Sequence, residues 1–208
     1  MSTLKTTLKK KIDEHRPRTT RLLKEFSDVK VSDVTIGQAI GGARGVRCLV
    51  TDTSYLDPNE GIRFRGKTIP ETFEALPKVT GSDYPSVESF WYYILTGEVP
   101  TKAQAEEVVA DFKKRAKVPE YVFDTLRALP ADTHPMAMFS IGISAMQRES
   151  VFVKRYHEGL NKMDYWDPMY EDCTNLMAKL PELGAFIYRH KFKNGDIKVL
   201  VATDVAGR

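Results

Sequence analysis

Residues Gly37–Gly66 read GQAIGGARGVRCLVTDTSYLDPNEGIRFRG, a stretch that holds six glycines and four arginines in thirty residues. Glycine lets a backbone turn sharply, or approach a ligand or another backbone closely. The run Leu56–Gly61 has the composition of a turn, and it separates two β-prone runs, Cys48–Leu56 and Ile62–Gly66. The stretch therefore predicts one small β-hairpin.

The chain before this hairpin has a helical pattern. Leu4, Leu8 and Ile12 recur at helical spacing and predict an amphipathic opening helix. Pro17 lacks a backbone donor, so we expect it to interrupt this helix before a second helical pattern at Thr20–Phe26.

The chain after the hairpin reads as helices up to residue 190. We expect the first to end at Gly97 and the last to bend, without breaking, at Pro181. Thr101 and Gln104 have the spacing of a capping box at the start of the second. The predicted helices are Ser86–Thr96, Lys102–Ala116, Pro119–Leu129, Pro135–Gln147 and a long helix that has Asp167-Pro168 as N-cap and first residue. The expected fold class is all-α with one small β-hairpin.

The composition limits the classes of function. The chain has 208 residues, 42% hydrophobic and 28% charged, which is ordinary for a globular domain. Residues 1–30 carry nine Lys/Arg against four Asp/Glu, so their net charge is +5, while the whole chain has +3. Because no recognition-helix or aromatic motif accompanies this excess, we interpret it as a solvated helix face and expect no nucleic-acid partner.

Cysteine usage and hydropathy point to a reducing compartment and to no membrane span. Cys48 and Cys173 lie far apart, and we expect both to be reduced, buried thiols. The longest stretch without charged residues, Thr133–Gln147, is shorter than the roughly 20 residues that span a bilayer. The acidic Asp13 and Glu14 argue against an intact transit peptide at the N-terminus.

The histidines do not predict a metal or general-base site. The chain has His15, His134, His157 and His190, which fall on separate helices or helix ends without ligand spacing. His134 stands just before a proline at an expected helix start, so we interpret it as a capping or buried structural imidazole. We expect His15 to be exposed.

Several runs of the sequence resemble citrate synthases. They are Leu56–Gly66 (LDPNEGIRFRG), Phe90-Trp91, Thr96–Thr101 (TGEVPT), His134–Met136 (HPM), Tyr170–Cys173 (YEDC), Lys179–Pro181 (KLP) and Ile187–Arg189 (IYR). The resemblance extends from about Leu4 to about Lys193. It implies an incomplete citrate-synthase-like large domain, with residues 1–193 as its N-terminal portion. The start Ser-Thr-Leu-Lys is similar to that of mature chains of the family, which implies the mitochondrial matrix, with the cytoplasm as the alternative.

The resemblance implies a reaction but assigns no catalytic residue here. Complete members of the family condense acetyl-CoA with oxaloacetate to give citrate and CoA, and hold no tightly bound cofactor. Their general base is an aspartate, and their donor histidines lie in runs such as Asn-Gly-Leu-Ala-Gly-Pro-Leu-His-Gly. This sequence does not contain those runs. We therefore expect residues 1–208 alone to be inactive.

Two basic residues match positions that reach the phosphates of coenzyme A in the family. Arg44 is the arginine of Gly-Gly-x-Arg-Gly, and Lys162 stands before the Tyr-Trp pair, where animal members have arginine. Lysine holds a phosphate as a point charge and lacks the bidentate fork of arginine. The alternative for Arg44 is a structural role in the glycine-rich loop. Arg63 and Arg65 are expected to make structural ion pairs.

The family resemblance also implies association. In citrate synthases the helices that match 135–147 and 167–189 contribute to a homodimer interface. The small residues that permit close helix approach are Ala137, Gly142, Ala145, Ala178 and Gly184. We expect a homodimer or a larger protein assembly through these helices.

The C-terminal residues depart from the family pattern. Residues 194–208 form a non-family tail, in which Lys198–Arg208 (KVLVATDVAGR) resembles a motif of DEAD-box RNA helicases. A partial sequence, a chimeric transcript and a truncated paralogue all explain this tail. The competing function is accordingly a non-catalytic structural subunit of a larger, mitochondrial assembly, and a third interpretation is a coenzyme-A-binding module.

Overall fold

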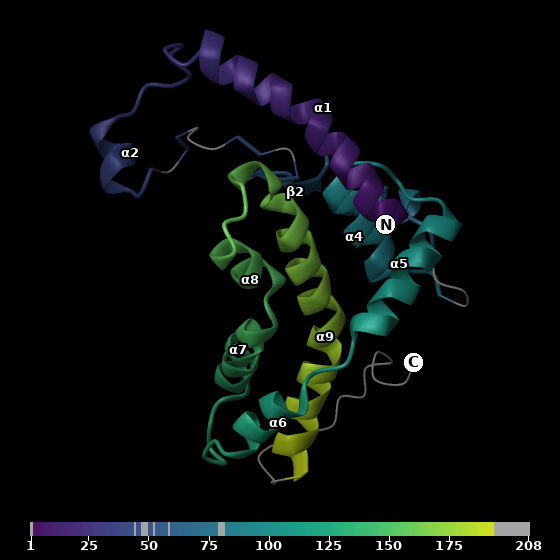
Figure 1. Ribbon diagram of the computed structural model, residues 1–208. Coiled ribbons are helices and arrows are strands. Elements are labelled where there is room, and N and C mark those ends of the chain that lie inside the picture. The colour runs from purple at the N-terminus through teal and green to yellow at the C-terminus, as the bar shows by residue number, and fades with distance from the viewer. Residues whose placement is uncertain are drawn as a thin grey trace. The chain divides into compact units, whose positions relative to one another are not determined.

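The computed structural model describes residues 2–43, 45–46, 50–51, 53–57, 59–78 and 82–193. The chain divides into two compact units, Met1–Val108 and Val109–Arg208, and the helix α5 (Lys102–Arg115) contributes to both. Among the described residues every regular element is helical except one two-stranded hairpin, so the predicted fold class is confirmed (Figure 1).

The first unit places a hairpin among helices. Its elements are α1 (Thr3–Glu25), α2 (Ile36–Ile40), β1 (Ser54–Asp57), β2 (Gly61–Phe64), α3 (Ile69–Ala75), α4 (Val87–Thr96) and the first part of α5. The strands pair antiparallel, with Ser54 opposite Phe64. They are shorter than the β-prone runs of the sequence, and Cys48 lies outside the described residues.

The helix α1 runs through Pro17, so the predicted interruption is wrong. A proline inside a helix removes one backbone hydrogen bond, a loss that the turns on either side of it can tolerate, and two threonines after Pro17 make side-chain bonds within the helix. Thr19 donates to the carbonyl of His15 at 3.3 Å, and Thr20 donates to that of Arg16 at 3.0 Å. The helix therefore continues to Glu25 as a single element.

The hairpin is fastened to α4 by side-chain contacts. The hydroxyl of Tyr93 donates to the carbonyl of Phe64 at 3.0 Å. Arg65 donates to the carbonyls of Ile94 and Leu95 at 2.9 and 3.0 Å, where the last carbonyls of α4 lack helical partners. These contacts cap the end of α4, a role that the sequence did not predict for Arg65. Arg63 forms the expected ion pair, with Glu60 at 2.7 Å.

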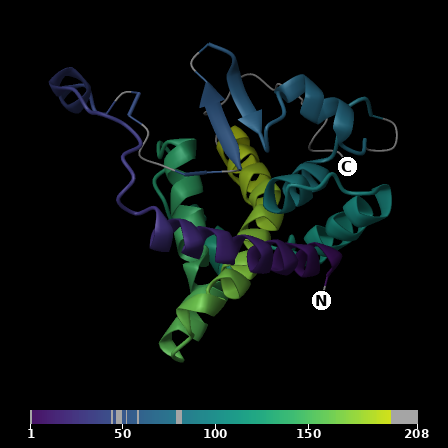
Figure 2. The same ribbon diagram turned by 90° about the horizontal axis from the view of Figure 1, so that it is seen from above.

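The second unit packs short helices against one long helix (Figures 1 and 2). Its elements after α5 are α6 (Glu120–Arg127), α7 (Pro135–Ala145), the 3₁₀ turn η1 (Met146–Glu149), α8 (Val151–His157), the 3₁₀ turn η2 (Lys162–Asp164) and α9 (Trp166–Lys193). Both α7 and α8 pack on α9, and α6 packs on α7. The core residues are Val118, Val122, Phe123, Leu126, Met138, Met146, Leu183 and Ile187.

Several helix ends follow local capping signals. Gly97 ends α4 in the left-handed region at φ 75°, as predicted. Thr101 and Gln104 bind each other's backbone N–H groups at 3.3 and 2.8 Å, which confirms the capping box. The helix α9 continues across Pro181 without a break but begins at Trp166. Asp167 is therefore not its N-cap, because its carboxylate pairs with Arg155 of α8 instead.

Two of the small residues expected at a dimer interface are used inside the second unit. A β-carbon added to Gly142 would lie 2.8 Å from Cδ1 of Leu183, so α7 and α9 approach closely at this position. Ala178 is also buried, with 5% of its surface exposed. Ala137, Ala145 and Gly184 remain exposed or half-buried.

Candidate functional site

The glycine-rich loop that carries Arg44 is tightly turned. Gly42, Ala43 and Gly45 have φ angles of 77°, 59° and 73°, in the left-handed region that favours glycine. Arg44 itself lies outside the described residues. Gly42 and Gly45 therefore permit the sharp backbone turns before and after Arg44, the predicted phosphate contact.

Lys162 lies at the surface of the second unit, in the 3₁₀ turn η2 that leads into α9. The turn is held by Asn161, whose side chain accepts a hydrogen bond from the backbone of Met163 at 2.9 Å. Gly159 provides the sharp turn after α8 at φ 87°. An exposed ammonium group on a capped turn can bind a phosphate group as a point charge.

The α8–α9 contact positions this turn. Asp172 of α9 accepts hydrogen bonds from the hydroxyl of Ser150 at 2.6 Å, and from the backbone N–H groups of Val151 and Phe152 at 2.7 and 3.1 Å. A carboxylate there satisfies the free N–H groups at the positive end of α8. The Arg155–Asp167 ion pair fastens the other end of α8 to the start of α9.

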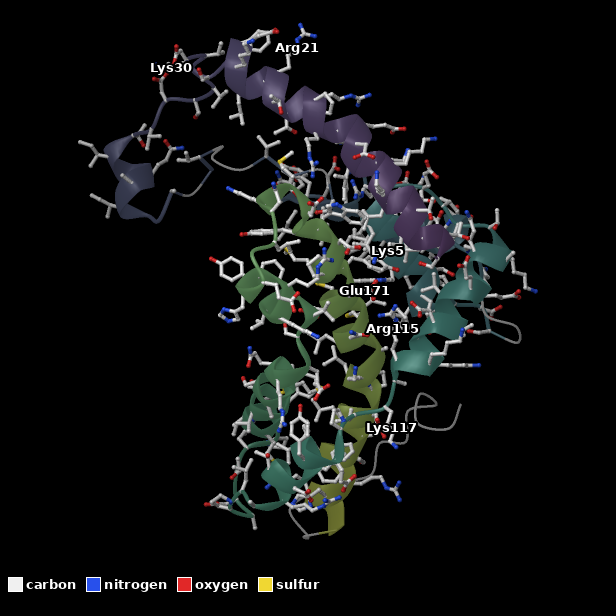
Figure 3. The ribbon with its side chains drawn as sticks, viewed as in Figure 1. Lys5, Arg21, Lys30, Arg115, Lys117 and Glu171 are labelled. Carbon is white, nitrogen blue, oxygen red and sulfur yellow. The ribbon has the colours of Figure 1, made fainter. Side chains whose placement is uncertain are left out.

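A second set of polar contacts joins α5 to α9. The guanidinium group of Arg115 donates to Asp111 at 2.9 Å, to Glu171 at 2.7 Å and to Asn175 at 2.8 Å (Figure 3). Burial acts to lower the pKa of Arg115, but its bonds to Asp111 and Glu171 raise it above the ordinary value. Sequence reasoning missed this network, because Arg115 and Glu171 are 56 residues apart and carry no local signal.

The histidines occupy the separate positions that the sequence predicts. His134 caps α7, where its Nδ1 accepts a hydrogen bond from the backbone of Met136 at 3.2 Å, and His15 is exposed on α1. His190 stacks on Phe186 with ring centroids 5.8 Å apart. Within the described part of the chain, no three His, Cys, Asp or Glu side chains gather as metal ligands do.

Cys173 differs from its prediction. The structure places this residue on an exposed face of α9, so the expectation of a buried thiol is wrong. The burial-prone character of cysteine could not show which face of α9 holds this position. Desolvation nevertheless raises the pKa of its thiol, and the charge of Asp172 adds to that effect.

No helix among the described residues is both long and apolar enough to cross a membrane.

Comparisons with known proteins identify the family. The sequence model of the family described as citrate synthase, C-terminal domain, matches residues 42–207. This match takes in most of the tail, which lies outside the described residues, so the non-family origin of the tail stays a prediction.

Curated relatives agree with this match. The chain is 43% identical over 194 residues to a mitochondrial citrate synthase of Aspergillus niger, covering 93% of this chain and 41% of that one. It is 45% identical over 193 residues to a peroxisomal citrate synthase of Saccharomyces cerevisiae, covering 91% and 42%. It is 43% identical over 186 residues to a mitochondrial 2-methylcitrate synthase of Yarrowia lipolytica, covering 89% and 40%. The chain therefore spans about two fifths of the length of these relatives, and it belongs to the citrate synthase family.

Proposed function

We propose that the complete protein condenses acetyl-CoA with oxaloacetate to give citrate and CoA, and that residues 1–208 supply part of its helical frame. The single observation that carries this proposal is the family match over residues 42–207. A relative of similar identity is named for 2-methylcitrate. Overall identity to the relatives therefore does not specify the acyl donor.

The reaction requires a base that removes a methyl proton, donors that stabilise the enol, and cations that hold two carboxylates. Residues 1–208 do not contain the sequence runs in which the family places its base and its histidines. None of the four histidines of this chain falls in such a run, and His134 caps α7. The chain alone is therefore proposed to be inactive.

The coenzyme A contacts are a second part of the proposal. Arg44 and Lys162 are the residues that would hold its phosphates. What supports this role is the exposure of Lys162 on a turn that α8 and α9 hold in place. Acetyl-CoA acts as a substrate here, and no tightly bound cofactor is proposed.

Association is proposed to occur through α7 and α9. Large apolar side chains are exposed on both helices: Met136 is 63%, Met169 50% and Tyr188 37% exposed. A β-carbon placed on Gly184 would meet no heavy atom within 4 Å, which leaves room for a second helix. Exposed apolar faces of this kind favour a homodimer or a larger assembly.

The mitochondrial matrix is the proposed location. Relatives with this level of identity include mitochondrial proteins of Aspergillus niger and Saccharomyces cerevisiae, and also a peroxisomal protein of Saccharomyces cerevisiae. The family therefore works in more than one compartment, and the support for the mitochondrial one is that two of these three relatives are named for it.

A structural subunit is the competing proposal. The observation that favours it is the combination of exposed apolar side chains with a sequence that lacks the catalytic runs. The transcript beyond Lys193 separates the two. A reading frame that continues into the His-Gly and aspartate-containing runs, with a product that releases thiol only when oxaloacetate is present, supports the enzyme. A stop after Arg208 supports the structural subunit.

A further inference from the structure

A small cavity lies in the second unit between α7, η1 and α9. Its volume is about 150 Å³, and Ile143, Met146 and Leu176 form the apolar part of its wall. Ser150, Asp172 and Asn175 add polar groups to that wall. Gln147 and Glu149 also line it, and both are exposed, so the cavity reaches the surface. The remaining wall includes Lys179, a half-buried residue of α9.

The amine of Lys179 has no close acceptor. Across the part of the chain that the structure describes, no group accepts a hydrogen bond from its Nζ or forms an ion pair with it. Half-buried lysines commonly place the stem against apolar groups and the ammonium group in water, and partial burial of the charge carries a cost. Its position in the cavity wall removes part of the water around this amine, and this desolvation disfavours the charged form.

The charges near Lys179 do not cancel the effect of burial on the pKa of its amine. Burial lowers the pKa of its amine, Glu149 acts to raise it again, and Arg115 adds to the lowering. Glu149 also accepts a hydrogen bond from the hydroxyl of Tyr121 at 3.1 Å. Glu171 is engaged with Arg115.

Two further carboxylates of α9, Asp172 in the cavity wall and Glu182 outside it, are engaged in other contacts. Asp172 binds the start of α8, and Glu182 accepts a hydrogen bond from the backbone of Val118 at 2.5 Å. Among the described residues, Glu149 is the carboxylate whose charge raises the pKa of the Lys179 amine.

A lysine that is desolvated and lies near another cation is an activated nucleophile, because more of its amine is neutral at physiological pH. We propose that Lys179 is a site of acylation by thioesters, with the cavity receiving the small acyl group. This inference does not depend on citrate formation by the chain.

The chemical step is an aminolysis. The neutral Nζ of Lys179 attacks the carbonyl carbon of the thioester, and a C–N bond forms as the C–S bond breaks. The thiolate leaves and takes up the proton that the nitrogen loses, so the products are an amide and a free thiol. No oxidant, metal or further reactant is required.

The test compares lysines within one chain. The purified 208-residue protein is incubated at pH 7.5 with S-acetyl-N-acetylcysteamine, a small thioester without phosphates, and the acetylated fraction of each lysine is followed by peptide mass spectrometry. The exposed Lys117 and Lys154, in the same unit, are the references. We expect Lys179 to be acetylated at least about threefold faster than either reference. An equal or slower rate at Lys179 overturns the proposal.

A matched variant tests the electrostatic cause. Glu149→Gln removes the charge that opposes the lowered pKa of Lys179 and keeps an acceptor for Tyr121. Acetylation of Lys179 should become faster in this variant, while Lys117 and Lys154 should react as before. An unchanged or slower rate at Lys179 contradicts the mechanism. If the variant fails to fold, as judged by circular dichroism, the comparison within the natural chain still decides the question.

Discussion

At the scale of single residues, the two glycines of the α7–α9 region differ in what surrounds them. A β-carbon at Gly142 would lie 2.8 Å from Leu183, whose side chain is fully buried and has little room to shift. A β-carbon at Gly184 would meet open space. The same substitution should therefore have opposite effects at the two positions.

We predict that Gly142→Ala lowers the free energy of unfolding by about 1–2 kcal/mol, because overpacking outweighs the better helix propensity of alanine. We predict that Gly184→Ala raises it by about 0.5–1 kcal/mol, because the helix gains propensity without a clash. Urea denaturation of each variant measures both values. A stabilised Gly142→Ala variant would show that Leu183 gives way easily.

Contacts between near neighbours in the chain were predictable from the sequence, and contacts between helices were not. His134 and the Thr101–Gln104 capping box were predictable, because their partners lie within three residues along the chain. The contact of Gly142 with Leu183 and the exposure of Cys173 depend on how α7 and α9 face each other. No local pattern carries that information.

At the scale of elements, α8 depends on one carboxylate from another helix. Asp172 receives three hydrogen bonds from the start of α8, two of them from backbone N–H groups. We predict that Asp172→Ala lowers the free energy of unfolding by about 2 kcal/mol, because it leaves these donors without a partner. Denaturation followed by circular dichroism measures the loss.

Two controls accompany the Asp172 variant. Asp172→Asn keeps one acceptor oxygen and should lose less stability than the alanine variant. Glu158→Ala removes an exposed carboxylate near the other end of α8 and should change stability by less than about 0.5 kcal/mol. Equal losses in all three variants would mean that Asp172 does not support α8.

The turn of the hairpin should respond to acid. Asp57 accepts hydrogen bonds from the backbone N–H groups of Asn59 and Glu60 at 2.8 and 3.0 Å, and these bonds lower the pKa of its carboxyl group. A lowered folded-state pKa gives stability that is present above the ordinary value of about 4 and is lost as pH falls through the folded-state value.

We therefore predict that the amide resonances of Asn59 and Glu60 stay constant down to about pH 4 and move together below it. The measurement is a pH titration by proton–nitrogen NMR, with Asp57→Ala as the control that should show no such movement. A midpoint above the ordinary value for aspartate would contradict the role of these hydrogen bonds.

The sequence predicted which segments are helical better than it predicted their bounds. The end of α4 at Gly97 and the start of α5 were predicted correctly, because these helix ends have local chemical signals. The expected break at Pro17 was wrong, because a single missing donor does not end a helix whose neighbouring residues continue it. The predicted start of α9 was wrong by two residues: the helix begins at Trp166, and the carboxylate of Asp167 pairs with Arg155.

At the scale of the whole molecule, the exposed apolar side chains predict association. They include Met136 on α7 and Met169 and Tyr188 on α9. We expect light scattering after size-exclusion chromatography to give a mass above that of one 23.6 kDa chain at micromolar concentration. Met136→Glu combined with Met169→Glu should shift the protein toward the monomer. A monodisperse monomer in the natural chain would contradict the proposed interface.

The chain belongs to the citrate synthase family, and the central proposal is that residues 1–208 do not catalyse the reaction by themselves. The loss of one preorganised donor typically costs a factor of about 10²–10³ in rate, and residues 1–208 do not contain the runs in which the family places its donors.

The most direct test is the release of free thiol from acetyl-CoA by purified residues 1–208, with and without oxaloacetate. We predict no oxaloacetate-dependent release above the buffer rate. Variants in which His15, His134, His157 or His190 is replaced by alanine control for a co-purifying enzyme. Sustained turnover that requires oxaloacetate, and that one of these variants abolishes, would contradict the account.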